Sequence, residues 1–227
     1  MSPLQKSAPT RVRLTGGKFR GQLLDVPKSG THPMGERERL ALFNAIISFS
    51  PNIFSQDIRI LDAYAGGGTL GFEAISRGAT SENVIFVEKN LPACATIRQN
   101  AEKLHLADRL RLFQGPVDSF LAKIKHKTPF DLIFMDPPYD QFSPEMIENM
   151  LPALSKSGLL VVSRPSPLCN REKNRTKVPK SEDPKAEESK EESKTECPKA
   201  EDLNFGGLKL LKTAQYAGAH LTFLQKS

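Results

Sequence analysis

The sequence predicts an α/β fold in which helices cover one mostly parallel sheet. Between residues 58 and 162, short apolar runs alternate with segments of helical length, which is typical of βαβ units with right-handed crossovers. Two apolar runs near the end of the chain, at 208–212 and 220–224, predict a closing antiparallel pair. A glycine-containing segment at 11–26 predicts a small hairpin ahead of the sheet.

Each element follows from a local pattern. Residues 11–26 alternate in polarity and contain Gly16, Gly17 and Gly21, which favour turns between extended pieces. Residues 36–47 place apolar side chains at helical spacing, which predicts a helix. Beyond this helix, strands are predicted at 58–61, 83–87, 110–113, 131–135 and 159–162, and helices at 70–77, 91–104, 117–125 and 143–154.

The chain of 227 residues is expected to hold one folded domain with a basic extension. Residues 1–35 form the predicted N-terminal hairpin and extension, and residues 36–227 form the main domain. Within the main domain, residues 165–202 contain almost no large apolar side chains and carry nine basic and ten acidic groups. We therefore expect a disordered low-complexity insert between two strands, and expect it to be dispensable because a longer loop adds little closure free energy.

Positive charge gathers at the N-terminal end of the chain. Residues 1–39 contain eight basic and three acidic residues, whereas the whole chain carries a formal net charge of +6. A local basic excess is the expected footprint of a polyanionic partner, although a solvated surface can have the same composition. The candidate residues for such a contact are Arg11, Arg13, Lys18, Arg20, Arg37 and Arg39.

The cysteines and the N-terminal residues argue against a disulfide-bonded, zinc-binding, secreted or membrane-spanning protein. Cys94, Cys169 and Cys197 are odd in number and show no C-x-x-C spacing, so neither a disulfide framework nor a zinc site is expected. The first residues are polar and basic, and no long apolar span follows them. The sequence therefore predicts a cytoplasmic protein with no metal centre and no membrane contact.

An acid, two prolines and an aromatic residue end the predicted strand at 131–135. The carboxylate of Asp136 can accept an N–H from an exocyclic amine, and Pro137 and Pro138 hold nearby carbonyls rigidly as further acceptors. The ring of Tyr139 offers a stacking face, worth about 1–3 kcal/mol per base. This pattern is typical of methyltransferases that modify amino groups of nucleobases or of glutamine. A proline-rich strand exit with a packed tyrosine is the structural alternative.

A glycine-rich turn follows the strand predicted at 58–61. Gly66, Gly68 and Gly71 satisfy G-x-G-x-x-G, a spacing that lets the backbone approach a ligand at a helix N-terminus. Glu88, at the end of the next strand, is placed to hold the two hydroxyls of a ribose. Both a nicotinamide dinucleotide site and an S-adenosylmethionine site use these features, and glycines in such a turn are often purely structural.

Two observations favour S-adenosylmethionine over the dinucleotide. Asp62 precedes the glycine-rich turn, where its negative charge repels a pyrophosphate and attracts a sulfonium or an ammonium group. In a doubly wound sheet, the carboxyl ends of the strands that precede Asp62, Glu88 and Asp136 open on the same crevice. The amine-binding motif therefore lies beside the adenosyl-type site, and a dehydrogenase has no use for such a motif.

The chain resembles the RsmD-type methyltransferases, which methylate the N2 amine of a guanine in small-subunit ribosomal RNA. The resemblance covers nearly all of the sequence except residues 165–202. It rests on several motifs in a fixed order: Arg13-Leu14-Thr15-Gly16-Gly17-Lys18-Phe19-Arg20-Gly21, Arg37-x-Arg39 followed by Leu42-Phe43-Asn44, Asp62-x-x-Ala65-Gly66-x-Gly68-x-Leu70-Gly71, Glu88, Asp136-Pro137-Pro138-Tyr139 and Tyr216-x-Gly218.

The resemblance implies a Rossmann-like class I methyltransferase fold, with a mostly parallel seven-stranded sheet, an antiparallel C-terminal strand pair and a small N-terminal β-hairpin. It also implies S-adenosyl-L-methionine as the donor, RNA bound at the basic N-terminal face, and a monomer acting on small-subunit ribosomal RNA or the assembling subunit. The implied catalytic residues are Asp136, Pro137, Pro138 and Tyr139. The implied donor-binding residues are Asp62, Ala65, Gly66, Gly68, Glu88, Lys89, Gln114 and Asp136, and the RNA-binding residues are the six basic ones named above.

The sequence departs from the family pattern in three places. Met34-Gly35 replaces a stretch that often carries threonine, and Ser163-Arg164 stands where a glutamate is usual. Gln114-Gly115-Pro116 stands where the family usually has a polar residue that contacts the adenine, and Gln114 or a backbone N–H is expected to make that contact here.

Other functions remain open at this point. One alternative is the same chemistry on adenine N6 of DNA or RNA, or on a protein glutamine. Others are a catalytically idle RNA-binding protein and, more remotely, a nicotinamide dehydrogenase.

Overall fold

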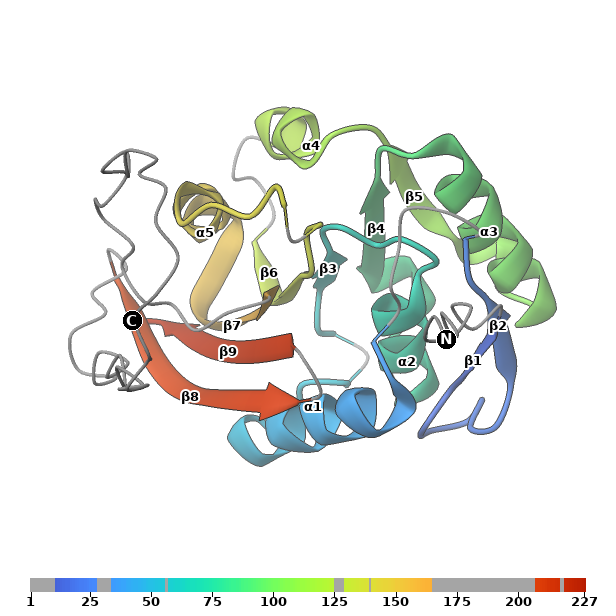
Figure 1. The fold of residues 1–227 in the computed structure, drawn as a ribbon, viewed down its shortest axis with the longest axis horizontal. Coiled ribbons are helices and arrows are strands. Elements are labelled where there is room, and N and C mark those ends of the chain that lie inside the picture. Colours follow the sequence, from blue (N-terminus) through green and yellow to red (C-terminus); the bar gives the residue numbers. More distant parts are fainter. Residues whose placement is uncertain are drawn as a thin grey trace, which may run out of the picture.

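The computed structural model describes residues 11–27, 34–55, 57–124, 129–138, 140–164, 207–216 and 219–227. Its elements (Figure 1) are β1 (Arg11–Arg13), β2 (Leu23–Asp25), α1 (Glu36–Phe49), β3 (Ile60–Asp62), α2 (Thr69–Ser76), β4 (Val84–Glu88), α3 (Leu91–Lys103), β5 (Arg111–Gln114), α4 (Val117–Ile124), β6 (Phe130–Met135), α5 (Glu145–Met150), β7 (Leu154–Arg164), β8 (Leu208–Tyr216) and β9 (Ala219–Lys226). The predicted insert at 165–202 and Tyr139 lie outside the described residues.

A seven-stranded sheet with the order β5-β4-β3-β6-β7-β9-β8 organises the chain. The strands from β5 to β7 pair in parallel, and β9 pairs antiparallel with both β7 and β8. The chain runs outward from β3 to β4 and β5, then returns to β6 on the other side of β3. Strand order therefore reverses between β3 and β6, where open α/β sheets bind ligands beyond the carboxyl ends of the strands. The predicted fold class is confirmed.

The elements before β7 differ most from the prediction. The helix expected at 143–154 is shorter, because α5 ends at Met150 and a 3-10 turn, Leu151–Ala153, follows it. Pro152 lies in that turn, and its ring nitrogen cannot donate the hydrogen bond that would continue the helix. β7 then begins at Leu154 rather than at residue 159, and its pairing with β6 shifts register between Phe130 and Leu132.

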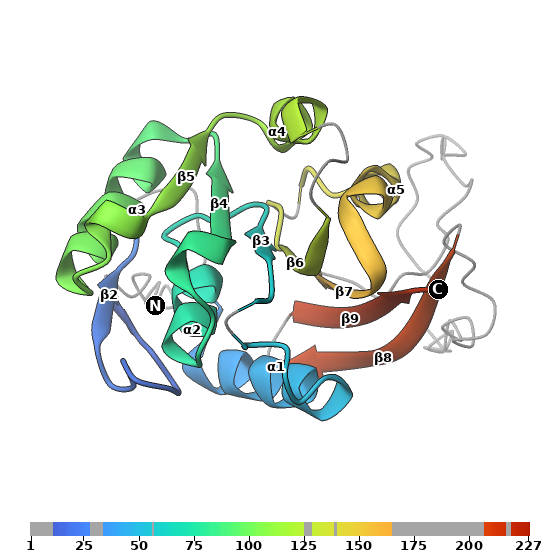
Figure 2. The ribbon, with the colours of Figure 1, turned by 180° about the vertical axis from the view of Figure 1, so that it is seen from behind.

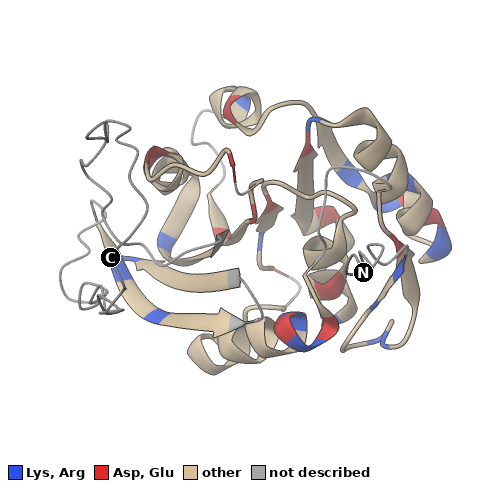
Figure 3. Cartoon of the chain, viewed as in Figure 1, with Lys and Arg blue, Asp and Glu red and all other residues tan. Residues whose placement is uncertain are grey.

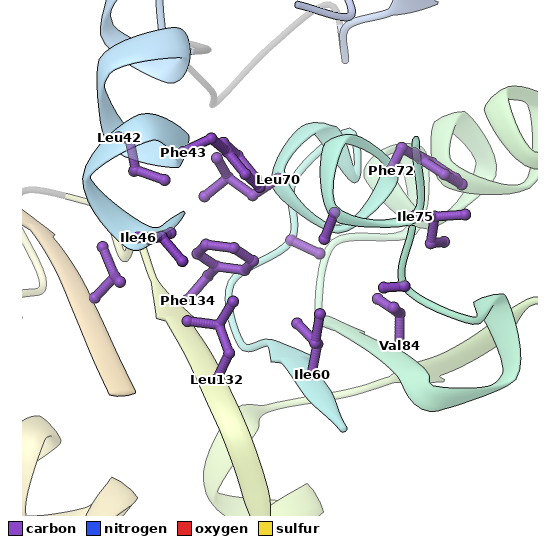
Figure 4. Packing of buried hydrophobic residues seen from close by; sticks show 14 of the residues in the cluster. Leu42, Phe43, Ile46, Ile60, Leu70, Phe72, Ile75, Val84, Leu132 and Phe134 are labelled. Atoms are coloured by element: carbon purple, nitrogen blue, oxygen red, sulfur yellow. The ribbon is translucent and has the colours of Figure 1, made fainter. Parts of the chain in front are cut away.

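Helices cover both faces of the sheet. Figures 1 and 2 show the molecule from opposite sides, and helices lie on both sides of the strands in each view. α1, α2 and α3 contribute to one apolar cluster, while α4 and α5 contribute to a second cluster on the other face. The first cluster is shown in Figure 4, where side chains of α1 and α2 pack onto the strands: Leu42, Phe43, Ile46, Leu70, Phe72, Ile75, Ile60, Val84, Leu132 and Phe134. Within the described residues, no helix is long and apolar enough to cross a membrane.

The N-terminal hairpin shares the core of the main sheet. Val12 and Leu24 are buried in the same apolar cluster as the side chains of α1 and α2. The turn of the hairpin lies against the end of α2, where the N–H of Lys18 donates to the carbonyl of Ser76 at 2.7 Å. Gly17 has a φ of +75°, and a Cβ there would lie 1.7 Å from the Ser76 carbonyl oxygen. Only glycine allows this close approach.

A buried ion pair joins the hairpin to α1 and α2. Arg39 and Glu73 have fully buried side chains, and Arg39 Nε lies 3.6 Å from Glu73 Oε2. The Arg39 guanidinium also donates to the carbonyls of Met34, at 2.6 Å, and Arg13, at 2.5 Å. Glu73 accepts further hydrogen bonds from the backbone N–H of Thr15 at 2.9 Å and from Arg77 Nε at 3.0 Å. Burial lowers the pKa of Arg39, and the nearby Glu73 carboxylate opposes that shift.

The prediction that Arg39 contacts RNA is therefore wrong. Its side chain is inaccessible to solvent and already engaged by one carboxylate and two backbone carbonyls. A sequence shows positive charge along a chain, but it does not show which cations the fold turns inward.

Candidate active site at the carboxyl ends of the sheet

Three carboxylates meet where the strand order reverses. Asp62 is the last residue of β3, Glu88 is the last residue of β4, and Asp136 directly follows β6. Because β3 lies between β4 and β6, the three strand ends are neighbours in the sheet. Figure 3 shows acidic segments in red at this central edge of the sheet. The fold thus brings these three sequence-predicted residues together.

Hydrogen bonds tie the backbone of the glycine-rich turn to both strands that flank β3. The N–H of Ala63 donates to the Phe134 carbonyl of β6 at 3.0 Å, and the N–H of Ala65 donates to the Val87 carbonyl of β4 at 3.0 Å. The N–H of Gly66 donates to Glu88 Oε2 at 2.8 Å. These bonds hold the turn against the ends of its neighbouring strands, so the backbone there is ordered before any ligand binds.

Gly68 and Gly71 have distinct structural roles at the start of α2. Gly68 is the N-cap residue and has a φ of +80°, a conformation that favours glycine. At Gly71, a Cβ would lie 2.2 Å from Phe86 Cε1, so the absence of a side chain lets α2 pack closely on β4. At least two glycines of the G-x-G-x-x-G spacing are therefore required by the start of α2 and by its packing on β4, apart from any contact with a ligand.

Glu88 is half-buried and has room for further contacts. One of its oxygens accepts from Gly66, and the other accepts from the backbone N–H of Asn90 at 2.8 Å. Each carboxylate oxygen has a second lone pair that can accept a hydroxyl group. Gln114 pairs with Glu88 in the sheet register and is exposed, with its side-chain oxygen 3.3 Å from Arg98 Nη2. Lys89 is exposed and donates to the side chain of Gln141 at 3.0 Å.

The carboxyl group of Asp62 is held partly in its neutral form. Its residue is 1% exposed, and this loss of solvation raises the pKa of Asp62 to about 7. A hydrogen bond from the N–H of Gly71, at 2.9 Å, opposes the increase, whereas the Asp136 and Glu88 carboxylates add to it.

Asp136 is half-buried, and desolvation raises its pKa to about 6. A hydrogen bond from the Ser163 side chain opposes this shift, and the negative charge of Glu38 on α1 adds to it.

These raised pKa values cost folding free energy near neutral pH. An aspartate in the unfolded chain ionises near its ordinary pKa of 3.8, but the folded groups hold their protons up to about pH 6 and pH 7. The folded protein is therefore at its most stable, with respect to these two groups, below pH 3.8, where both are protonated in the folded and unfolded states. This stability is lost as the pH rises through the folded pKa values of about 6 and about 7. A cation bound beside the three carboxylates would offset this cost. Among the described residues, no group of three or more potential metal ligands is arranged to hold an ion.

The remaining residues of the predicted motif are placed less completely. Pro137 is buried and Pro138 is exposed, so the chain turns outward directly after Asp136. Tyr139 lies outside the described residues.

Of the six basic residues predicted to bind RNA, all except Arg39 lie on the surface. Arg11, Arg13, Lys18, Arg20 and Arg37 are exposed, and Figure 3 shows several blue segments along the otherwise mostly tan hairpin. Arg11 pairs with Asp25 at 3.2 Å, and Arg13 Nη1 donates to the Gly21 carbonyl at 3.1 Å. Arg37 lies in the first turn of α1, next to Glu38, whose charge acts on Asp136. The hairpin and the start of α1 therefore present a basic surface.

Two residues near Asp136 were not among the candidates drawn from the sequence. Ser163 donates a hydrogen bond to Asp136 from the neighbouring strand, and Glu38 acts on it from α1. Two sequence signals pointed to Ser163, a polar residue at the end of an apolar strand and a departure from the family pattern, which usually has a glutamate there. Glu38 gave no such signal, because it reads as an ordinary residue of a helical first turn, where it accepts from the N–H of Gly35 at 3.0 Å.

The chain is similar to known proteins over most of its length. The family model described as "Conserved hypothetical protein 95" matches residues 12–196. The protein named ribosomal RNA small subunit methyltransferase D of Haemophilus influenzae is 34% identical over 136 residues, 59% of this chain and 66% of that protein. Its counterpart of the same name in Escherichia coli strain K12 is 35% identical over 146 residues, 64% of this chain and 69% of that protein. The chain thus spans about two thirds of the length of these relatives.

Solved structures share the whole fold. A putative methyltransferase from Escherichia coli superposes with a TM-score of 0.67 at 25% identity, covering 96% of this chain and 98% of that chain. A hypothetical protein from Thermus thermophilus superposes with a TM-score of 0.65 at 26% identity, covering 93% of this chain and 98% of that chain.

Proposed function

The chain belongs to the family described as conserved hypothetical protein 95, the RsmD-type family, and from this membership we propose that it is an S-adenosyl-L-methionine-dependent ribosomal RNA methyltransferase. We propose the exocyclic N2 amine of a guanine in small-subunit RNA as its target. The observation that carries this proposal is the meeting of Asp62, Glu88 and Asp136 at the reversal of strand order, with the Asp-Pro-Pro sequence on the β6 side.

The donor would lie over the ends of β3 and β4. The free lone pairs of Glu88 suit the two ribose hydroxyls, and the ordered backbone at Gly66 can approach the ligand closely. The negative charge around Asp62 suits the sulfonium and the ammonium of the donor. The proposed donor site also includes the neighbours of Gly66 and Glu88 in the sequence and the end of the adjacent strand β5: Ala65, Gly68, Lys89 and Gln114.

The acceptor amine would lie at the end of β6. The Asp136 carboxylate and the Pro137 carbonyl would accept its two hydrogens and aim the nitrogen lone pair at the donor methyl group. In the transfer, the nitrogen–carbon bond forms as the carbon–sulfur bond breaks, and the electron pair of that bond leaves on sulfur. Most of the acceleration would come from holding nitrogen, carbon and sulfur in line. Pro138 and Tyr139 follow Asp136 and Pro137, and the ring of Tyr139 would stack on the guanine after it leaves its duplex.

The RNA would bind along the basic hairpin and the start of α1. We propose that residues 1–35 serve as an RNA-binding extension of the methyltransferase domain formed by residues 36–227. Arg11, Arg13, Lys18, Arg20 and Arg37 are exposed on this side and suit contacts to phosphates. We further propose that the protein acts as a cytoplasmic monomer, since ribosomal RNA is found there and one chain supplies both the basic surface and the acidic site.

Methyl transfer to separated acceptors tests this function. The protein is incubated with methyl-labelled donor and, in turn, with small-subunit particles, naked ribosomal RNA, DNA and ribosomal protein. We expect label at guanine N2 in the particles or their RNA. Label at adenine N6 or at a glutamine would contradict the proposed target, and absence of transfer to every acceptor would contradict the enzymatic function.

Donor affinity should depend on pH. Because the pKa of Asp62 is about 7 in the free protein, binding a cation below that pH requires release of a proton. We expect affinity to rise with pH by up to about tenfold per unit below the pKa and to level off above it. Calorimetry in buffers of different ionisation enthalpy measures both the affinity and the proton release.

Variants of Asp62 and Glu88 distinguish the pH dependence of donor affinity from a general loss of donor binding. Asp62→Asn should bind the donor weakly and without the pH dependence, because the titrating group is gone. Glu88→Ala should bind weakly at every pH while keeping the dependence, because Asp62 is intact. Equal donor affinity in the wild type across this pH range would contradict the proposed role of Asp62.

RNA binding should fall steeply with salt. Each phosphate contact contributes about 0.7–0.9 to the slope of log affinity against log salt concentration. The double substitution Arg13→Ala with Arg20→Ala should therefore weaken binding and flatten the slope by about 1.4–1.8. Salt-titrated binding curves measure this, and donor affinity should stay unchanged.

The matched control removes the same charge from another surface. Lys209 and Lys212 are exposed on β8, at the opposite edge of the sheet from α3 and the hairpin (Figure 1). Lys209→Ala with Lys212→Ala should leave the slope as in the wild type. If both double variants change the slope equally, the hairpin has no special part in RNA binding.

A further inference from the structure

A buried serine hydroxyl lies beside the proposed catalytic carboxylate. Ser163 is 3% exposed and belongs to β7, the strand that pairs in parallel with β6. Met135 of β6 pairs with Val162 of β7, so Asp136 and Ser163 are the next residues along the two strands. The Ser163 side chain forms a hydrogen bond with the Asp136 carboxylate. With Asp136 ionised, the hydroxyl is the donor, because a carboxylate only accepts.

The direction of the two side chains follows from strand alternation. Met135 and Val162 contribute to the apolar cluster that α4 and α5 cover. Successive side chains of a strand point to opposite faces, so Asp136 and Ser163 are directed to the face that α1 covers. The influence of Glu38, a residue of α1, on Asp136 agrees with this direction. Asp136 therefore points to the side of the sheet on which α1 packs, with Ser163 of β7 beside it.

The surroundings of Asp136 otherwise favour its neutral form. The negative charge of Glu38 on α1 raises the pKa of Asp136, and the Asp136 carboxylate in turn raises the pKa of Asp62 at the end of β3, so both of these neighbours are acidic. Burial acts in the same direction. The hydrogen bond from Ser163 opposes these effects. Losing a hydrogen bond to a charged group shifts a pKa by about one to two units, which is large enough to decide the charge of the carboxyl group near neutral pH.

We propose that Ser163 is a positioning residue for methyl transfer, whose hydroxyl keeps the Asp136 carboxylate ionised and turned toward the acceptor amine. This role rests on the proposed function of the site. An ionised carboxylate accepts an amine hydrogen, whereas a protonated one presents a competing O–H donor. One Asp136 oxygen is engaged by Ser163, which limits rotation of the group and leaves the other oxygen for the substrate. Ser163 itself does not touch the reacting atoms.

The role predicts a change in pH dependence as well as in rate. Ser163→Ala should move the acid limb of the kcat profile upward by about one to two pH units, the shift equivalent to losing a hydrogen bond to a charged group. The fold loss of kcat should be largest on the acid limb, at about pH 6 and below, and should shrink to a few-fold at high pH. Measurements use saturating donor, so that titration of Asp62 does not enter. The KM for the donor should stay within a few-fold of the wild type.

Two further variants separate positioning from packing. Ser163→Thr restores a hydroxyl and should return the acid limb toward its wild-type position. Ser155→Ala removes a comparable bond on the same strand, because Ser155 Oγ donates to Asp131 Oδ1 at 2.7 Å near the other end of β7. That control should lower thermal stability without moving the acid limb.

The outcomes distinguish this role from the proposed function. Active wild-type protein together with an unmoved acid limb in Ser163→Ala would overturn the positioning role alone. Wild-type protein without methyl transfer to any acceptor would overturn the proposed function and the role with it. A carbon-13 titration of the Asp136 carboxyl in the ligand-free protein gives a second measurement, in which Ser163→Ala should raise the Asp136 midpoint and Ser155→Ala should not.

Discussion

Asp136→Ala is expected to lower the rate of methyl transfer by about 10²–10⁴-fold, the range that a positioned proton-accepting group contributes. The substitution removes the acceptor for the amine hydrogen at the end of β6 and leaves the Gly66 and Glu88 contacts at the end of β4 in place. Donor affinity should therefore change by no more than a few-fold. Single-turnover transfer rates and calorimetry of donor binding measure the two quantities separately.

Two variants sharpen this result. Asp136→Asn should retain part of the activity, because its amide oxygen still accepts one hydrogen bond. Asp108→Ala removes an exposed carboxylate from the short 3-10 turn before β5 and should leave turnover as in the wild type. Turnover of Asp136→Ala within a few-fold of the wild type would remove Asp136 from the mechanism.

Arg39→Met is expected to destabilise the folded protein by about 3–5 kcal/mol, the usual result of breaking a buried ion pair on one side. The substitution removes the donor to the carbonyls of Met34 and Arg13 and leaves Glu73 with one fewer cation. For a chain of this size, the loss corresponds to a Tm lower by about 6–20 °C. Thermal and denaturant unfolding measure it.

The exposed neighbour on the same helix is the control. Arg37→Ala should change the free energy of unfolding by less than about 0.5 kcal/mol, as surface substitutions usually do, but should reduce the salt dependence of RNA binding. Arg39→Met with Glu73→Leu removes both charges and should recover part of the lost stability. Unchanged stability in Arg39→Met would contradict the buried role assigned to this arginine.

The strand and helix pattern was readable from the sequence because it depends on local periodicity. Apolar runs at 58–61 and 131–135 anticipated β3 and β6 to within two residues. The alternation of elements implied a parallel sheet, and a parallel sheet brings the residues after its strands to one edge. The sequence alone therefore predicted that Asp62, Glu88 and Asp136 lie together. The helix predicted at 143–154 was too long, because Pro152 ends it. A proline is tolerated in the first turn of a helix but not in its interior, so its effect depends on where the helix starts.

Charge was harder to interpret, because a charged residue looks alike in a sequence whether it is exposed or buried. Arg37 and Arg39 are two positions apart on α1, yet one faces solvent and the other pairs with Glu73 inside the protein. A helix turns about 100° per residue, so the spacing of Arg39 to Leu42, Phe43 and Ile46 places it on the apolar face of α1. An arginine on such a face can still extend past it to solvent, and only the packing of α1 against α2 and the hairpin encloses its charged group. No pattern within residues 36–49 reveals the partner, since Glu73 is far away in the chain.

The residues proposed to bind and react were thus identifiable from local motifs and from the parallel sheet that alternating strands and helices imply. The residues that set the charge of the site were not. Ser163 reaches Asp136 because β7 lies beside β6, and Glu38 acts on it because α1 covers that face of the sheet. Solvation, neighbouring charges and hydrogen bonds determine a pKa, and all three depend on contacts between distant segments. Folding alone brings those segments together.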